Sequence, residues 1–213
     1  MRSVHISTTM RWNLVGLAIV AALIAALWPR SAAGPGVADA GSAPVATQAE
    51  LRTAAANAAL QPCPATGAAR AAGPLAGLAL PCLDGGSAVD FATALGGKPA
   101  VLNLWTWWCP PCAKELPVMQ EFADRAGPAV TVLAVHSDPD VLKALQALRG
   151  YGVHLPSVQD SQQRVAAMVG APAAYPATVL LRADGTVAQV LAVPFADPAA
   201  IAAAVHKWLG VGV

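Results

Sequence analysis

Apolar residues gather into short runs along the second half of the chain, separated by polar stretches rich in Gly, Pro and Asp. Two runs, residues 99–106 (PAVLNLWT) and 129–136 (AVTVLAVH), carry almost no charge and little alternation, which is typical of strands buried on both faces of a sheet. Shorter runs predict three further strands, over residues 155–159, 178–182 and 187–193.

Helical patterns lie between these strands. Residues 110–126 form the longest candidate helix, with Pro117 inside it as an expected kink. A second helix is predicted from Asp138 to about Arg149, with the Asp138 side chain as its N-cap.

Three further helices complete the pattern. One is predicted over residues 161–169, with Ser161 as its capping residue, and one over residues 197–209. An alanine-rich helix is also expected within residues 48–60. An Asp184-Gly185 turn between the last two strands predicts a β-hairpin.

The segment just before the first long strand is harder to assign. Residues 78–83 form a short apolar stretch, and residues 89–95 are expected to form a helical turn. From residue 99 onward, strands and helices alternate and then give way to the hairpin and a closing helix. This order predicts an α/β domain whose mixed central sheet carries helices on both faces.

Another apolar run lies near the N terminus. Residues 12–28 (WNLVGLAIVAALIAALW) contain one clearly polar side chain and are at the short end of the length that crosses a bilayer. A tryptophan stands at each end, and Arg2 and Arg11 precede the run. Because basic flanks stay in the cytoplasm, we expect everything after the run to face outward.

The resulting domain organisation has four parts. They are a basic cytoplasmic N-terminus (1–11), a transmembrane signal-anchor helix (12–28), a linker rich in Gly, Pro and Ala (29–60) and one domain (61–213). A cleaved signal peptide is the alternative for the second part, and both interpretations export the domain.

Composition narrows the choice of partners. The chain has 13 basic and 12 acidic residues, so no strongly basic surface is expected and nucleic acid is excluded as a predicted partner. A domain of this size buries an adequate hydrophobic core without a metal, and we expect a monomer with no cofactor.

The most specific motif is Cys109-Pro110-Pro111-Cys112, between a predicted strand and a predicted helix. A spacing of three residues places both sulfur atoms on one face of the first helical turn, within disulfide range. The helix N-terminus favours the thiolate form of the first cysteine. We therefore predict that Cys109 attacks as a thiolate and that Cys112, deeper in the helix, acts as the resolving thiol.

Two alternatives for this motif carry less weight. A zinc site needs four ligands, and the other two cysteines, Cys63 and Cys82, lack the spacing of a second ligand pair. An inert structural disulfide is the other alternative, but a loop this short is strained and reducible.

The motif and its surroundings also carry a family resemblance. The stretch 102–112 (LNLWTWWCPPC), followed by Lys-Glu-Leu-Pro at 114–117, resembles the TlpA/ResA/CcmG-like exported thioredoxins over about residues 73–210. This resemblance implies a thioredoxin-like fold and thiol–disulfide exchange.

Two further site residues follow from the resemblance. It implies an acidic residue below the cysteine pair, which is Glu115; one helical turn after Cys112, this carboxylate would handle the thiol proton. The alternative is a glutamate that complements the helix dipole. The resemblance also implies a cis proline beside the sulfur atoms, which is Pro176, with Pro172 as the rival candidate.

Aromatic residues surround the motif. Trp108 directly precedes Cys109 and is expected to shield the disulfide, whereas Trp105 is expected in the core and Trp107 could take either place. Two histidines, His136 and His154, carry no functional prediction; His136 is expected to be a polar loop residue after its strand.

Cys63 and Cys82 remain once the motif cysteines are paired. We predict a structural disulfide between them, which an exported domain permits. A second redox pair that relays electrons to Cys109 is the alternative, and free thiols are another.

Together these features predict a membrane-anchored extracytoplasmic protein-disulfide oxidoreductase. Its expected partners are extracytoplasmic thiol or disulfide proteins and a redox partner protein, and the direction of exchange is left open. The alternative function is a thioredoxin-fold chaperone that holds copper or supplies thiols for cytochrome c maturation.

Overall fold

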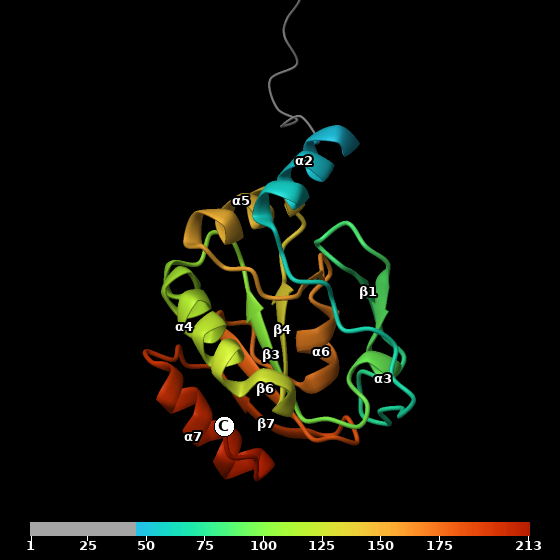
Figure 1. Cartoon of the computed structure of the whole chain (residues 1–213), viewed down its shortest axis with the longest axis vertical. Helices are drawn as coiled ribbons and strands as arrows, with labels where there is room; N and C mark the ends of the chain where they lie inside the picture. Colours follow the sequence, from blue (N-terminus) through green and yellow to red (C-terminus); the bar gives the residue numbers. More distant parts are fainter. Residues whose placement is uncertain (1–45) are drawn as a thin grey trace, which may run out of the picture. The chain divides into compact units, whose positions relative to one another are not determined.

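A five-stranded mixed sheet forms the centre of the fold in the computed structural model, which describes residues 46–213 (Figure 1). The strand order is β5-β4-β3-β6-β7, in which β3, β4 and β5 pair in parallel and β6 runs antiparallel to both of its neighbours, β3 and β7. The strands are β3 (Ala100–Trp105), β4 (Thr131–His136), β5 (Ser157–Gln159), β6 (Ala177–Leu181) and β7 (Val187–Leu191). All six residues of β3 are buried, as expected of a central strand covered on both faces.

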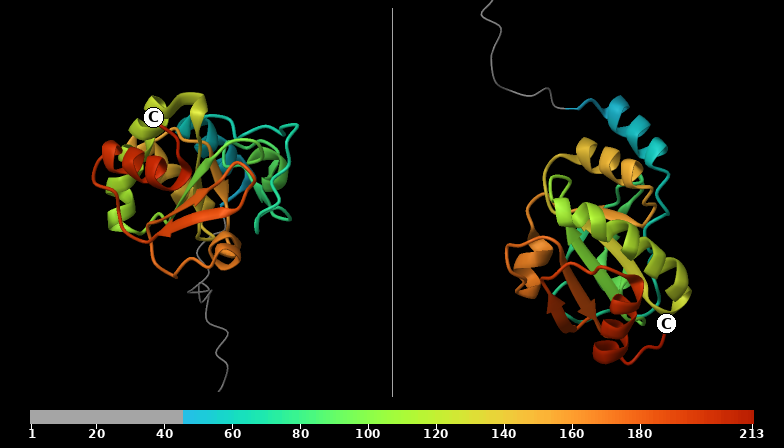
Figure 2. Two further views of the ribbon diagram at one scale, coloured as in Figure 1. Left: turned by 90° about the horizontal axis from the view of Figure 1, so that it is seen from below. Right: turned by 90° about the vertical axis from the view of Figure 1, so that its left-hand side faces the viewer.

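Helices cover both faces of this sheet, which confirms the predicted architecture (Figure 2). One hydrophobic cluster joins one face of the sheet to α4 (Pro110–Ala126), α5 (Val141–Tyr151) and α7 (Pro198–Leu209). A second cluster joins the other face to α3 (Phe91–Ala94) and α6 (Arg164–Val169). The helix α4 has the predicted bounds and continues through Pro117.

The prediction that Asp138 caps α5 was wrong. Asp140, not Asp138, is the N-cap, and its carboxylate accepts a hydrogen bond from the Lys143 amide at 3.1 Å. Asp138 precedes Pro139 and lies outside the helix, where its side chain is free to bond elsewhere. An aspartate on each side of a proline looks alike in sequence, and only the chain path separates their roles.

The capping prediction for α6 was also wrong. Its N-cap position is Gln163, whose side chain makes no capping bond. The first amides of the helix, those of Arg164 and Val165, instead donate to the two carboxylate oxygens of Asp160 at 3.0 and 2.8 Å. The Ser161 hydroxyl accepts a hydrogen bond from Gln159 at 2.9 Å. Asp160 is only 1% exposed, so its carboxylate is part of the domain interior.

A small two-stranded sheet precedes the central one. It pairs β1 (Ala79–Pro81) with β2 (Ala88–Asp90), a strand that overlaps residues for which the sequence predicted a helical turn. The expected helical turn over residues 89–95 is reduced to α3, with Asp90 as its N-cap. A short 3-10 helix, η1 (Gly127–Ala129), links α4 to β4.

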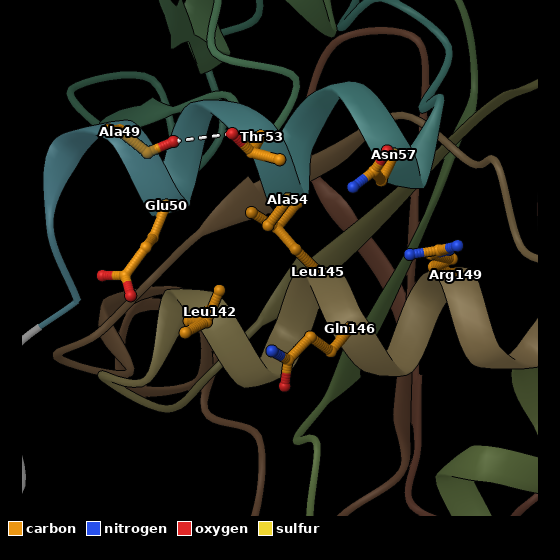
Figure 3. Close-up of a pocket in the computed structure, with 9 residues that line it drawn as sticks. All are labelled: Ala49, Glu50, Thr53, Ala54, Asn57, Leu142, Leu145, Gln146 and Arg149. Carbon is orange, nitrogen blue, oxygen red and sulfur yellow. Dashed lines mark hydrogen bonds between the residues drawn. The ribbon is translucent and has the colours of Figure 1, made fainter.

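The alanine-rich segment forms the helix α2 (Gln48–Ala58), with a capping box between Thr47 and Glu50. The prediction assigned this segment to the linker, yet it packs on α5 and belongs to the compact unit of residues 46–213. Figure 3 shows Ala54 of α2 facing Leu145 of α5 across a groove of about 410 Å³. None of the predicted site residues lines this groove.

No helix within residues 46–213 is long and apolar enough to cross a membrane. The predicted signal-anchor helix (12–28), the basic N-terminus (1–11) and most of the predicted linker lie outside the described residues.

Candidate active site

Cys109 and Cys112 are joined by a disulfide at the N-terminus of α4, with their Cα atoms 5.2 Å apart. Strand β3 ends at Trp105, the chain turns over three residues, and Cys109 becomes the N-cap of the helix. Pro110 and Pro111 occupy the first helical turn, where a missing amide hydrogen costs nothing. The cysteine pair therefore lies where the carboxyl end of a central strand meets a helix N-terminus.

The two sulfur atoms have different surroundings. The Cys109 sulfur accepts a hydrogen bond from the Cys112 amide at 3.2 Å, as expected of an atom at the positive end of a helix dipole. Cys109 is 4% exposed, whereas Cys112 is fully buried. Of the two cysteines, Cys109 is therefore the one with a small exposed surface.

A hollow of about 410 Å³ lies in front of Cys109. Trp108, which is 53% exposed, stands on it beside Tyr175, with the two ring centroids 6.4 Å apart and the rings edge-on at 85°. Among the described residues, none of those that line this hollow is charged: they are Trp108, Cys109, Pro110, Pro111, Gln163, Ala173 and Tyr175. We call it the active-site groove.

Pro176 follows Tyr175 at the start of β6. The peptide bond between them is cis, and within residues 46–213 it is the one cis bond, so Pro172 is trans. The register of β6 against β3 pairs Ala177 with Leu104, which brings Pro176 level with the end of β3 and hence beside the motif.

Glu115 lies inside the domain, 1% exposed, one turn below Cys112. Its carboxylate accepts a hydrogen bond from the Asn103 side-chain amide at 2.7 Å and one from the Phe195 backbone amide at 2.8 Å. Burial raises the pKa of the Glu115 carboxyl above its ordinary value, and the bonds from Phe195 and Asn103 oppose this without cancelling it. A carboxyl with a raised pKa is better suited to exchange a proton near neutral pH.

His136, His154 and Trp105 lie where they support the fold. Trp105 is fully buried, as predicted, and its ring lies 4.8 Å from the His136 ring. His136 is not a loop residue: it ends β4, is fully buried and shares a hydrogen bond of 2.9 Å with Gln159. Burial lowers the pKa of His136, which favours a neutral ring in the core. His154 bonds to the Ala58 carbonyl at 3.0 Å and so ties the end of α2 to the domain.

Sequence reasoning missed the roles of two residues around the site. One is Asn103, the partner of Glu115, which looks like any polar residue in a strand. The other is Asp138, whose carboxylate accepts hydrogen bonds from both the Trp107 and the Trp108 indoles, at 3.0 and 2.9 Å. The available signal was position, since Asp138 follows a strand that is parallel and adjacent to the one carrying the motif.

Cys63 and Cys82 form the second disulfide, with Cα atoms 6.1 Å apart. Cys82 directly follows β1 and forms an isolated bridge with Val158 of β5. It packs in the cluster with α3 and α6, whereas Cys109 and Cys112 pack in the cluster with α4 on the opposite face of the sheet. This separation favours the structural disulfide over an electron relay.

Comparisons with known proteins agree with this arrangement. The soluble secreted antigen MPT53 of Mycobacterium tuberculosis is 38% identical over 93 residues, which are 44% of this chain and 53% of that protein. The thiol-disulfide oxidoreductase ResA of Bacillus subtilis is 31% identical over 98 residues, 46% of this chain and 54% of that protein. The chain therefore spans about half the length of these curated relatives.

A solved structure gives longer coverage. The crystal structure of a secreted disulfide oxidoreductase from Mycobacterium tuberculosis is 30% identical and superposes with a TM-score of 0.53, over 62% of this chain and 96% of the other. The model of the Redoxin family matches residues 63–205, well over half of the chain. The chain therefore belongs to the Redoxin family, and its predicted resemblance to the TlpA/ResA/CcmG-like branch is confirmed.

Proposed function

We propose that this protein is an extracytoplasmic thiol–disulfide oxidoreductase that exchanges disulfides with protein substrates through Cys109 and Cys112. The observation that carries the proposal is the disulfide at the N-terminus of α4, with Cys109 at the active-site groove and Cys112 buried behind it. The names of the related thiol-disulfide oxidoreductases support it.

The exchange proceeds in two steps of sulfur chemistry. The Cys109 thiolate attacks one sulfur of a substrate disulfide, which forms a mixed disulfide and releases the other substrate sulfur as a thiolate. The Cys112 sulfur then attacks Cys109, so that the intramolecular disulfide forms and the second substrate thiolate leaves. The substrate gains two electrons and the protein loses two; oxidation of a substrate follows the same path in reverse.

Glu115 handles the proton of the buried Cys112 thiol in this scheme. Cys112 must lose its proton before it attacks, and bulk water does not reach it because it is fully buried. Glu115 lies one turn away on the same helix face, with its pKa raised by burial. Trp108 lines the groove beside Cys109 and, with the cis proline Pro176 at the same end of the sheet, limits the directions from which a substrate can approach.

Two cysteine variants test the mechanism directly. Cys109→Ser should abolish reduction of insulin disulfides, because Cys112 cannot reach an external disulfide from inside the domain. Cys112→Ser should instead accumulate a mixed disulfide with its substrate, visible as a thiol-sensitive adduct on a non-reducing gel. Full activity of Cys109→Ser would refute the proposal. Cys63→Ser/Cys82→Ser is the control for loss of a disulfide elsewhere.

The location belongs to the same proposal. The basic flank and apolar run of residues 1–28 support export and a membrane anchor. The Cys63–Cys82 disulfide supports an oxidising compartment, and related proteins are named as secreted. We infer a monomer that meets thiol or disulfide proteins and a redox partner protein outside the cytoplasm.

A further inference from the structure

Two tryptophans and one carboxylate form a connected unit beside the reactive sulfur. Trp107 and Trp108 follow β3, and Asp138 follows β4, which pairs in parallel with β3 so that Trp105 stands opposite His136. The segments that follow β3 and β4 leave the sheet at the same edge, and this brings the two indole N–H groups to the same carboxylate. Their separation in sequence, 30 and 31 residues, conceals the unit from any local pattern.

The two carboxylate oxygens divide their partners unequally. Oδ1 accepts from the Trp107 indole at 3.0 Å and from the Asp140 backbone amide at 2.9 Å. Oδ2 accepts from the Trp108 indole at 2.9 Å. These bonds lower the pKa of Asp138 although burial alone would raise it, so the carboxylate stays ionised as an acceptor.

Trp107 is braced from its other side. The Lys143 ammonium lies 4.1 Å from the centre of the Trp107 ring and forms an ion pair of 3.0 Å with Asp140. Trp108 lacks such a brace: it is 53% exposed, and its ring meets Tyr175 edge-on across the active-site groove. The orientation of Trp108 therefore depends on its one bond to Asp138 and on that edge contact.

We propose that Asp138 is a positioning residue for disulfide exchange, which holds Trp108 as a fixed aromatic wall of the groove beside Cys109. Asp138 is not required to cap α5, because Asp140 does so. The inference rests on the proposed function and adds a determinant of substrate class. A fixed, uncharged wall favours polypeptide disulfides flanked by apolar side chains, which bury against it, over small thiols that need only the sulfur.

Asp138→Asn isolates the bond to Trp108. An asparagine has one side-chain oxygen, which can keep Trp107 and the Asp140 amide, while its NH2 group then faces the Trp108 indole and cannot accept from it. The KM for insulin reduction should rise about fivefold, the equivalent of roughly 1 kcal/mol for one hydrogen bond, with kcat little changed. The rate at which dithiothreitol reduces the Cys109–Cys112 disulfide should not change.

Trp108→Phe and the double variant show whether Asp138 acts through Trp108. Trp108→Phe keeps an aromatic ring but removes the N–H donor, so it should raise KM by a similar factor. Asp138→Asn/Trp108→Phe should add nothing further, because both changes remove the same bond. Asp124→Asn, which removes one negative charge from the exposed side of α4, is the matched control and should behave as wild type.

Nuclear magnetic resonance supplies a readout that is independent of turnover. The indole N–H signal of Trp108, identified by its loss in Trp108→Phe, should shift in Asp138→Asn while the Trp107 signal stays in place.

Any one of three results would overturn the proposed positioning role of Asp138. They are an unshifted Trp108 indole signal in Asp138→Asn, a wild-type KM in Asp138→Asn, and a KM increase in the double variant equal to the product of the two single-variant increases. A wild-type protein that fails with both insulin and dithiothreitol would instead refute the proposed function.

Discussion

Glu115 and Asn103 illustrate how the interior of this domain constrains a single charge. Glu115 is 1% exposed, and its carboxyl has two hydrogen-bond donors but no cationic partner within residues 46–213. The Asn103 side-chain oxygen has no hydrogen-bond partner within the described part of the chain. Ionised Glu115 is therefore stabilised by two dipoles rather than by a counter-charge, which is why burial prevails and its pKa is raised.

Glu115→Gln should change how stability depends on pH. In wild type, the unfolded carboxyl loses its proton at a lower pH than the folded one, so the free energy of unfolding falls as pH rises from the unfolded pKa through the raised folded pKa. Glutamine has no proton to lose, so Glu115→Gln should gain stability relative to wild type over that window. Urea unfolding of both proteins between pH 4 and 8, as a rough range, measures the difference. A difference that stays constant, or falls with pH, would contradict the raised pKa.

At the scale of the elements, β1 and the segment before it are attached to the sheet by more than hydrogen bonds. The backbone of Cys82 pairs with that of Val158 in β5, and the Leu83 amide donates a hydrogen bond to the Ser157 carbonyl at 2.8 Å. The disulfide from Cys82 to Cys63 then attaches the preceding segment to the same edge. The β1–β2 sheet has only three residue pairs and depends on this attachment.

Replacing both cysteines of this disulfide tests its structural role. Cys63→Ser/Cys82→Ser should lower the free energy of unfolding by about 3 kcal/mol, the value expected for a loop of this length when the unfolded chain is no longer cross-linked. Insulin reduction should persist at the wild-type rate under conditions where the variant is folded. Chemical unfolding and the insulin assay measure the two effects. Loss of activity in a folded variant would favour the electron relay instead.

On the scale of the whole molecule, the residues of the candidate active site lie together at one edge of the sheet. The motif and Asp138 follow the carboxyl ends of β3 and β4, and Pro176 directly precedes β6, which runs the other way. Backbone at this edge turns away from the sheet to enter a helix, which leaves side chains exposed to a partner. The two hydrophobic clusters beneath it hold the strands in register.

Location is tested on the full chain in cells. The full-length protein should remain with membranes after an alkaline wash, and its cysteines should react with a membrane-impermeant maleimide after reduction of intact cells. A chain that begins at residue 46 is the control and should stay soluble and protected inside the cell, because it lacks residues 12–28. Protection of the full-length protein in intact cells would contradict export.

Local pattern alone determined most of the elements and the identity of the reacting pair. Long apolar runs predicted β3 and β4, the bounds of α4 were predicted to the residue, and two cysteines at a strand–helix junction indicated redox chemistry. These predictions succeeded because burial, helix entry and the thiolate at a helix N-terminus depend on neighbours within a few residues.

The tertiary structure decided the partners of those residues. It assigned the N-cap of α5 to Asp140 and the first amides of α6 to Asp160, gave Glu115 its bond from Asn103, and brought Asp138 to two indoles that precede it by about 30 positions. Hydrogen bonds of this kind form between side chains that the sheet register aligns, and the register is a property of the packed strands rather than of any one segment.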